Sequence, residues 1–302
     1  MTTTGSTGGP GAGAVKLAKR ERGGFPVMRL FGHKVSPLAQ IGLAIVAINL
    51  FVALFAPWIA PFDQATPVGD PWADPDAHHW LGLDNLGRDL LSRLIYAARL
   101  SIGITLVITA LSFAIGIITG FAAAVAGGWV DLALSRLVDL MLAMPTLIFA
   151  FVVLSVLGTS IPVLIITIAL LDAPKVYRLA RAVAMGLVNL EFVEAARLRG
   201  EGWWWIIRRE ILPNSIPPLT AEFGLRFCFT FLFVASLSFL GLGVQPPAAD
   251  WGSMVRDYKD MIDYGSIAPI YPAGAIAILT IGVNFVVDWM LAIHSRGQGE
   301  GS

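Results

Sequence analysis

The sequence predicts an all-α integral membrane protein with six transmembrane helices. Of its 302 residues, 56% are hydrophobic and only 14% are charged, whereas a typical soluble domain carries about 25% charged residues. The apolar residues also lie in long blocks, and a helix needs about 20 residues to cross the hydrocarbon core of a bilayer. Lipid is therefore the expected solvent for much of the chain.

Six segments are predicted to be spans. The second contains no charged residue and would be roughly 40 Å long at about 1.5 Å per residue, so it must tilt or protrude. The fourth is the weakest, because its apolar run stops at Asp172. The predicted spans are residues 38–59, 101–127, 137–158, a segment beginning near Ile161, 216–240 and 269–292.

The distribution of basic residues predicts the orientation of these spans. With the N-terminus placed inside, the inside segments hold 15 of the 21 Lys and Arg residues and the outside segments hold 5, while Arg226 lies within a span. Because Lys and Arg are enriched in cytoplasmic loops, both termini are predicted to be cytoplasmic. The predicted domains are a cytoplasmic N-terminal tail (1–37) with a disordered first part, a transmembrane domain (38–292) and a cytoplasmic C-terminal tail (293–302).

The second span carries a stripe of small residues at four-residue spacing. Small side chains allow a second helix to approach closely. Packing inside the domain is the favoured interpretation of this stripe, and a seam at a subunit interface or pore is the alternative. The stripe consists of Ser112, Gly116, Gly120 and Ala124.

Four tryptophans lie close to predicted span boundaries. The amphipathic indole ring favours the headgroup region at both surfaces of a membrane. We therefore expect anchoring in the membrane interface, without a catalytic role, for Trp58, Trp129, Trp251 and Trp289.

The chain lacks the local motifs of common catalytic sites. It contains no G-x-x-x-x-G-K-[ST] phosphate loop, no H-E-x-x-H, no C-x-x-C and no local Ser-His-Asp set. The single cysteine, Cys228, lies in an apolar run and is expected to be a small core residue. Lys+Arg and Asp+Glu both number 21, and zero net charge argues against a nucleic-acid-binding protein. We expect no catalytic residue and no enzyme activity in this chain.

Two adjacent histidines, His78 and His79, follow Asp74 and Asp76 in the outside segment between the first two spans. These side chains are of the type that binds metal, but adjacent residues point in different directions on regular elements. A solvated polar loop is therefore the favoured interpretation, and no metal site is predicted.

One pair of opposite charges lies inside the fifth predicted span. Glu222 precedes Arg226 by four residues, so the two side chains share one face of a helix. An isolated charge in the membrane is costly, and pairing offsets part of that cost. The pair lies close to the inner surface, so pairing at a helix end or a subunit contact is favoured, with a place along a solute path as the alternative.

The segment of residues 185–215 is the main functional signal. Its first part, from Glu191, is rich in good helix formers, and two glycines are expected to end that helix. A second short helix is expected to follow and to end at prolines. The result would be a cytoplasmic helix, tight bend and helix, in which Ala195 and Ala196 let a partner surface come close. The boundary residues are Gly200, Gly202, Pro213, Pro217 and Pro218.

This segment resembles the coupling loop of ABC importer permeases, through E-A-A-x-x-x-G followed by I-L-P. In that family the helical elbow sits in a groove on the ATP-hydrolysing subunit and transmits its closure to the spans. Matched position by position, the resemblance implies a docking core of Glu194, Ala195, Ala196 and Gly200.

Further segments narrow the resemblance. Residues 81–93, LGLDNLGRDLLSR, are similar to the LGTDxLGRDxLSR signature of dipeptide/oligopeptide/nickel permeases. Residues 237–247, LSFLGLGVQPP, match a stretch that follows the fifth span in that group, and residues 250–254, DWGSM, resemble its S-W-G-x-M. The likeness covers about residues 38–292 and is to the second, C-type subunit. The departures are Glu210, where the broader pattern has Ile, the three tryptophans at 203–205, and the end after Asp288, which lacks the usual acidic, Leu-Arg-rich ending.

The resemblance implies a non-catalytic permease subunit of an ATP-driven importer in the cytoplasmic (inner) membrane of a prokaryote, carrying di- or oligopeptides. The implied partners are a B-type permease, two ATP-binding subunits, an extracytoplasmic solute-binding protein and the lipid membrane. ATP and Mg would be bound by the partners, with no cofactor in this chain.

Two alternatives stay open. Relatives of this family carry nickel, glutathione, opines or sugars, so the solute could belong to one of those classes. A self-sufficient secondary transporter would be a different class of protein. It would need ionisable residues near the bilayer midplane and internal repeats, and the sequence contains no clear inverted repeat.

Overall fold

The computed structural model describes the backbone of residues 29–30 and 33–299, in two separate units, residues 1–35 and 36–302. In the first unit, β1 (Arg29–Leu30) pairs antiparallel with β2 (His33–Lys34). The disorder predicted for the first part of the N-terminal tail lies outside the described residues. The second unit is helical and contains all the predicted spans.

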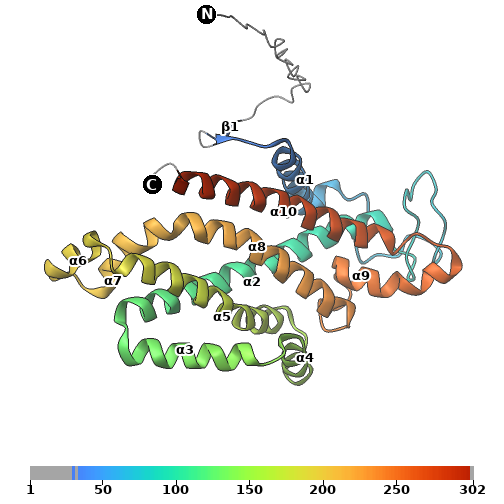
Figure 1. The fold of residues 1–302 in the computed structure, drawn as a ribbon. Helices are drawn as coiled ribbons and strands as arrows, with labels where there is room; N and C mark the ends of the chain where they lie inside the picture. The colour runs from blue at the N-terminus through green and yellow to red at the C-terminus, as the bar shows by residue number, and fades with distance from the viewer. Residues whose placement is uncertain (1–28, 31–32, 300–302) are drawn as a thin grey trace, which may run out of the picture. The chain divides into compact units, whose positions relative to one another are not determined.

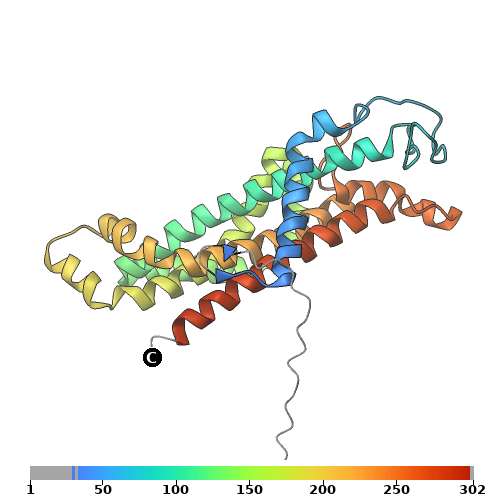
Figure 2. The same cartoon turned by 90° about the horizontal axis from the view of Figure 1, so that it is seen from above.

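The second unit is built from long helices joined by short ones (Figure 1). α2, α5 and α8 contact one another, and α1 packs on α10. Figures 1 and 2 show α6 and α7 at one end of this bundle, with α9 and the loop before α2 at the other. The elements are α1 (Pro37–Ile59), α2 (Leu90–Ala126), α3 (Gly128–Ala143), α4 (Thr146–Leu157), α5 (Ile161–Val188), α6 (Glu191–Leu198), α7 (Trp203–Ile206), the π-helical η1 (Ile207–Ile211), α8 (Leu212–Phe239), α9 (Trp251–Tyr258), the 3-10 helix η2 (Lys259–Tyr264) and α10 (Ile270–Gly299).

α2 begins 11 residues earlier than the apolar run that predicted it, at Leu90 rather than residue 101. The Asp89 carboxylate accepts a hydrogen bond from the backbone N–H of Ser92 at 2.8 Å, which caps the helix. The added turns contain Arg93, which is buried against protein instead of lipid. A search for apolar blocks ends where the first charge appears, so it misses these turns.

The small residues of α2 pack inside the domain, against α5. A Cβ atom added at Gly116 would lie 2.6 Å from Cβ of Val176, and one at Gly120 would lie 2.8 Å from the carbonyl oxygen of Tyr177. Ser112 is also fully buried. Internal packing is therefore the correct interpretation of the stripe at Gly116 and Gly120.

Among the described residues, four helical segments are long and apolar enough to cross a membrane: Pro37–Ile59, Leu90–Ala126, Trp203–Phe239 and Ile270–Ile293. The third predicted span is not one straight helix, because α3 and α4 meet at an angle of 87°. Met144 is extended before Pro145, as the proline ring disfavours a helical conformation in the preceding residue. α5 has 28 residues, but its second half carries charged side chains.

The prediction that the second helix of segment 185–215 ends at Pro213 and the paired prolines Pro217 and Pro218 is wrong. The helix continues from Trp203 to Phe239, through Pro213, Pro217 and Pro218. η1 ends at Ile211 and widens the helix two residues before Pro213, which lacks a backbone N–H. Local side-chain hydrogen bonds reinforce this region, since Asn214 and Ser215 donate to the carbonyls of Glu210 and Ile211 at 2.6 and 2.7 Å. Proline is tolerated in membrane helices where neighbouring groups compensate in this way.

The expectation of interface anchoring is wrong for Trp251, which is only 2% exposed. Its indole N–H donates to the carbonyl of Leu94 at 3.0 Å, and its ring packs edge-on against Phe231. Trp58 and Trp129 are largely exposed, and Trp289 is half-buried.

The close contact of α2 and α5 can be tested with Gly116→Ala. The added methyl group overlaps Val176, so the variant should unfold more easily by about 1–3 kcal/mol. Gly103→Ala makes the same change in α2, where nothing lies within 4 Å of the new Cβ, and should be neutral or stabilising by up to about 1 kcal/mol. Thermal unfolding in detergent measures both, and equal midpoints would contradict the packing.

Candidate functional site

The bend after α6 is produced by Gly200. Its φ of +83° is in the left-handed region that glycine adopts without strain. Its N–H donates to the carbonyl of Arg197 at 2.9 Å, and the N–H of Glu201 donates to that of Ala196 at 3.2 Å. These two bonds are a Schellman motif, which ends the helix and turns the chain. We call α6, this turn and α7 (Glu191–Ile206) the elbow.

The inner face of the elbow is fastened to the long helices. Val193 and Ala196 are fully buried in one apolar cluster with Phe121 of α2 and Ala180 of α5. Ile206, Ile207 and Ile211 belong to the same cluster. A displacement of α6 therefore acts directly on α2, α5 and the start of α8.

The outer face of the elbow contains three of the four predicted docking residues. Glu194, Ala195 and Gly200 are exposed, whereas Ala196 is 0% exposed and offers no surface to a partner. The expectation that both alanines admit a partner is therefore wrong for Ala196, because its position on α6 faces the chain's own core.

The three consecutive tryptophans take different positions. Trp205 is half-buried on the elbow, with the Arg199 guanidinium 5.9 Å from its ring. Trp203 and Trp204 are more than half exposed and meet edge to face at 6.3 Å between ring centroids. The exposed face of the elbow is thus aromatic as well as charged.

At the opposite end of the bundle, residues 81–93 form a buried charge network around Asp84. Asp84 is 0% exposed and accepts hydrogen bonds from the Arg88 backbone at 2.9 Å and from Arg88 Nε at 2.7 Å. Arg93 Nε lies 3.2 Å from the same carboxylate. Two cations thus compensate one buried anion, whose remaining lone pairs accept backbone N–H groups.

Arg93 extends this network to two other segments. Its Nη1 donates to the carbonyl of Gln64 at 3.0 Å, and its Nε lies 3.3 Å from the Tyr258 hydroxyl of α9. Burial raises the pKa of Tyr258 to about 12. The motif therefore holds the loop before α2 against α2 and α9.

The two histidines of this loop lie in different environments. His79 Nδ1 lies 3.1 Å from Asp89 Oδ1, and its ring packs on Phe62, whereas His78 is exposed. The backbone N–H groups of His79 and His78 lower the pKa of Asp76. No group of three or more His, Cys, Asp or Glu side chains suited to a metal occurs among the described residues.

The segment that follows α8 connects α8, α9 and α2 through close packing and hydrogen bonds. Gly243 lies so close to Ser238 that an added Cβ would overlap its hydroxyl. Asp250 caps α9, and burial raises the pKa of its carboxyl, opposed by the hydrogen bond to Ser253. The N–H of Trp251 donates to the Ser101 hydroxyl of α2 at 3.0 Å.

A cluster of four charges lies between α5 and α8. Arg226 Nε donates to Glu222 at 2.6 Å, which is the predicted pairing, and Arg226 Nη1 lies 3.8 Å from Asp172 Oδ1. Lys175 Nζ donates to the same Asp172 oxygen at 3.1 Å. Sequence reasoning missed Asp172 and Lys175 as members, because they come from another helix. The signal for Asp172 was its position at the end of an apolar run.

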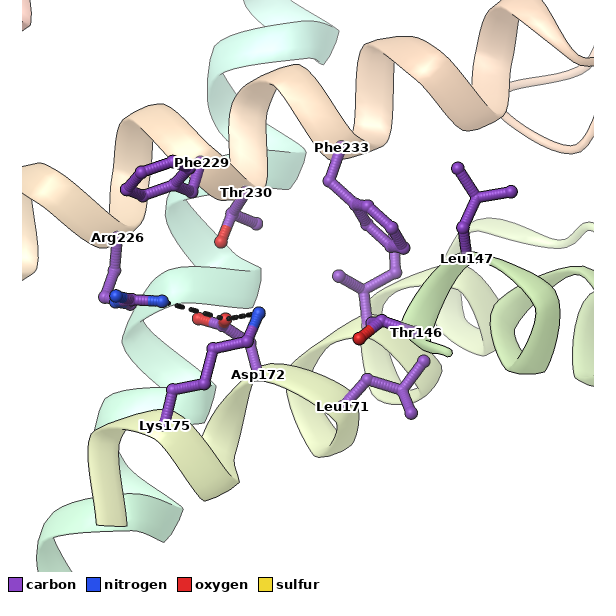
Figure 3. A pocket seen from close by; sticks show the side chains of 10 residues that line it. Thr146, Leu147, Leu171, Asp172, Lys175, Arg226, Phe229, Thr230 and Phe233 are labelled. Carbon is purple, nitrogen blue, oxygen red and sulfur yellow. Dashed lines mark hydrogen bonds and ion pairs between the residues drawn. The ribbon is translucent and has the colours of Figure 1, made fainter. Parts of the chain in front are cut away.

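The charge cluster borders a cavity of about 410 Å³ between the start of α4, the middle of α5 and α8. Figure 3 shows Asp172 and Lys175 reaching into the space from α5, with Arg226 and Thr230 coming from α8. Phe229, Phe233 and Leu171 supply apolar walls. The predicted Glu222–Arg226 pair is thus a helix-face pair, and its Arg226 also lines an open cavity.

Two family models match the chain. Residues 112–299 match the model described as binding-protein-dependent transport system inner membrane component, and residues 34–76 match the N-terminal TM domain of oligopeptide transport permease C.

Curated proteins with similar sequences are transport permeases. The dipeptide transport system permease protein DppC of Alkalihalophilus pseudofirmus is 36% identical over 258 residues, which cover 84% of each chain. The di/tripeptide transport system permease protein DppC of Pseudomonas aeruginosa is 37% identical over 265 residues, covering 85% of this chain and 87% of that one. The nickel transport system permease protein NikC of Escherichia coli is 36% identical over 250 residues, covering 82% and 90%.

The Asp84 network predicts a strong effect of Asp84→Asn. The substitution leaves Arg88 and Arg93 buried with less compensation, so stability should fall by about 3 kcal/mol or more. Asp70→Asn changes an exposed carboxylate of the same loop and should stay within about 0.5 kcal/mol of the parent. Thermal unfolding and protease cleavage between residues 60 and 89 provide the measurements. An Asp84→Asn protein as stable as Asp70→Asn would rule out this role.

Proposed function

The chain belongs to the family of binding-protein-dependent transport system inner membrane components, and we propose that it imports di- or oligopeptides as the C-type permease subunit of an ATP-driven importer. It is a multi-pass protein of the prokaryotic inner membrane, and its relatives are named as permease proteins of transport systems. Peptides are the proposed solutes because two relatives with 36–37% identity are named as permeases of dipeptide and di/tripeptide transport systems.

The observation that carries the proposal is the elbow. It presents Glu194, Ala195 and Gly200 to solvent on one face, and its other face is buried against α2 and α5. A partner that binds the exposed face of the elbow could therefore transmit its movement to the long helices. We propose that an ATP-binding subunit takes this contact, and that two such subunits bind the ATP and Mg.

The proposed topology has six spans, with both termini in the cytoplasm. The spans would be α1, α2, the bent pair α3 and α4, α5, α8 and α10. The excess of Lys and Arg in the segments assigned to the inside supports this orientation. The elbow and α9 lie at opposite ends of the bundle, as required for a cytoplasmic elbow and an extracytoplasmic outer loop (Figures 1 and 2).

The proposed outer end receives a solute-binding protein. At this end, contacts among Asp84, Arg93 and Tyr258 connect α9 to the loop that precedes α2. The loop and α9 therefore form one rigid surface. Trp80, Ile262 and Tyr264 are exposed there. Together with a B-type permease, this chain would enclose a central path, which opens alternately to each side as the ATP-binding subunits close and separate.

Substitution of Gly200 tests the coupling role of the elbow. Gly200→Pro cannot adopt a φ of +83° and removes the N–H that bonds to Arg197, whereas Gly200→Asn tolerates the left-handed conformation. In the reconstituted importer, Gly200→Pro should lower peptide uptake per ATP hydrolysed by about 5–150-fold, the usual range of coupling between sites.

Glu194→Lys should act similarly, because it reverses a charge on the exposed face. Gly200→Asn should transport at nearly the parent rate. Uptake and ATP hydrolysis are measured on the same vesicles. Normal coupling in Gly200→Pro and Glu194→Lys would remove the elbow from the mechanism.

Affinity purification of the tagged chain tests the subunit composition. The expected result is a complex with a second, different permease and two ATP-binding subunits, which hydrolyses ATP faster when loaded binding protein is added. A chain that is purified alone and transports solute alone in vesicles would instead support a secondary transporter.

A further inference from the structure

The cavity between α4, α5 and α8 contains two buried oxygen atoms without a hydrogen-bond partner in the described part of the chain. These are Asp172 Oδ2 and Thr230 Oγ1, on side chains whose residues are 6% and 3% exposed. Both residues line the cavity, from facing helices (Figure 3). Buried polar groups are normally paired, so each such exception indicates a missing partner.

The two oxygens of the Asp172 carboxylate have different surroundings. Oδ1 faces Lys175 at 3.1 Å and Arg226 at 3.8 Å, while Oδ2 has no partner among the described groups. Oδ2 is itself buried, so a donor would reach it through a small shift of the cavity wall, and it would leave both cations on Oδ1 in place. An ammonium group is such a donor, and Thr230 Oγ1 is available as a second acceptor for it.

Donors are also available on the other side of the carboxylate. Lys175 makes one hydrogen bond through an ammonium group that has three N–H donors. Arg226 bonds to Glu222 through Nε, and its guanidinium packs on the Phe229 ring at 5.4 Å, which holds its orientation. These two cations are placed to receive a carboxylate.

The charges of the cluster balance, which selects the kind of ligand. Asp172 and Glu222 offset Lys175 and Arg226, so a free cation meets two positive groups beside its acceptor, and a free anion meets negative ones. A ligand that carries both charges and no net charge satisfies all of them. The volume of about 410 Å³ is within the about 300–1,000 Å³ usual for small-molecule sites, and the apolar walls admit side chains of varied shape.

We propose that this cavity binds the zwitterionic backbone of a short peptide, with its ammonium group on Asp172 and Thr230 and its carboxylate on Lys175 and Arg226. This inference rests on the proposed function, since it assigns the cavity as a stopping point for the transported peptide. The elbow joins the inner ends of α5 and α8, the helices that supply these four residues. Movement of the elbow would therefore change the spacing between the two residues on α5 and the two residues on α8.

The experiment measures protection of a cysteine in the complete purified importer. Leu147 lines the cavity and is 42% exposed, so Leu147→Cys is the reporter, and Cys228→Ser removes the only native thiol of this chain, whose labelling is read separately from that of the other subunits. A charged methanethiosulfonate modifies the reporter in the presence of dialanine, N-acetyl-dialanine, dialanine amide or N-acetyl-dialanine amide. These four probes have nearly the same chain and differ in which terminal charge they carry.

Dialanine should protect the reporter at the lowest concentration. Loss of either terminal charge should raise the half-protecting concentration about tenfold or more, because hydrogen bonds between charged groups are the strong ones. In Asp172→Asn, the advantage of dialanine over N-acetyl-dialanine should disappear, while its advantage over dialanine amide remains. Thr230→Val should weaken protection, and Thr230→Ser should restore it.

Asp139→Asn is the matched control, since it removes an exposed carboxylate of α3 that does not line the cavity. It should leave all four concentrations unchanged. Equal protection by the four probes would show binding without recognition of the terminal charges, and protection by none would show no binding; either result would overturn the proposal. The four-probe comparison needs only the Leu147→Cys reporter with Cys228→Ser, so it decides even if Asp172→Asn does not fold. An importer that assembles and transports peptide without selective protection would refute this site alone and leave the proposed function standing.

Discussion

Gly116 and Gly120 bring the backbone of α2 against that of α5, closely enough that even one added carbon would overlap its neighbour. In a membrane, where lipid tails are as apolar as leucine, close packing of this kind holds helices together. α5 carries Asp172 and Lys175 in its middle, and its last turns support the elbow. The position of both proposed functional regions therefore depends on this one contact.

The buried carboxylates Asp84 and Asp172 are compensated in different ways. Asp84 is surrounded by two arginines and by backbone N–H groups, which is the arrangement of a charge that holds structure together. Asp172 has cations on one oxygen only, next to an open cavity. Burial of a carboxylate costs free energy in both cases. In the proposed site, the bound peptide completes the compensation of Asp172 at Oδ2.

The elbow and the cavity are mechanically related through covalent and packing contacts. α6 follows α5 after a two-residue connection, and α7 runs through η1 into α8 without a break. Val193 and Ala196 fix the inner face of the elbow in the same apolar cluster as α2 and α5. Because packed cores deform little, a push on the exposed face has to move whole helices, and the cavity between α5 and α8 would change with them.

Sequence alone determined what depends on neighbours along the chain. Composition set the membrane environment, Gly200 set the end of α6, and the four-residue spacing of Glu222 and Arg226 set their pairing. The motif at residues 81–93 was recognisable as a pattern, but its role as a buried network around Asp84 was not.

Only the tertiary structure decided which residues meet from different helices. It joined Asp172 and Lys175 to the Arg226 pair, turned Ala196 and Trp251 inward, bent the third span at Pro145 and continued a helix through three prolines. The physical reason is that spacing within a helix is fixed by 3.6 residues per turn. The facing partner of each side chain depends instead on how the helices pack, which no local pattern encodes.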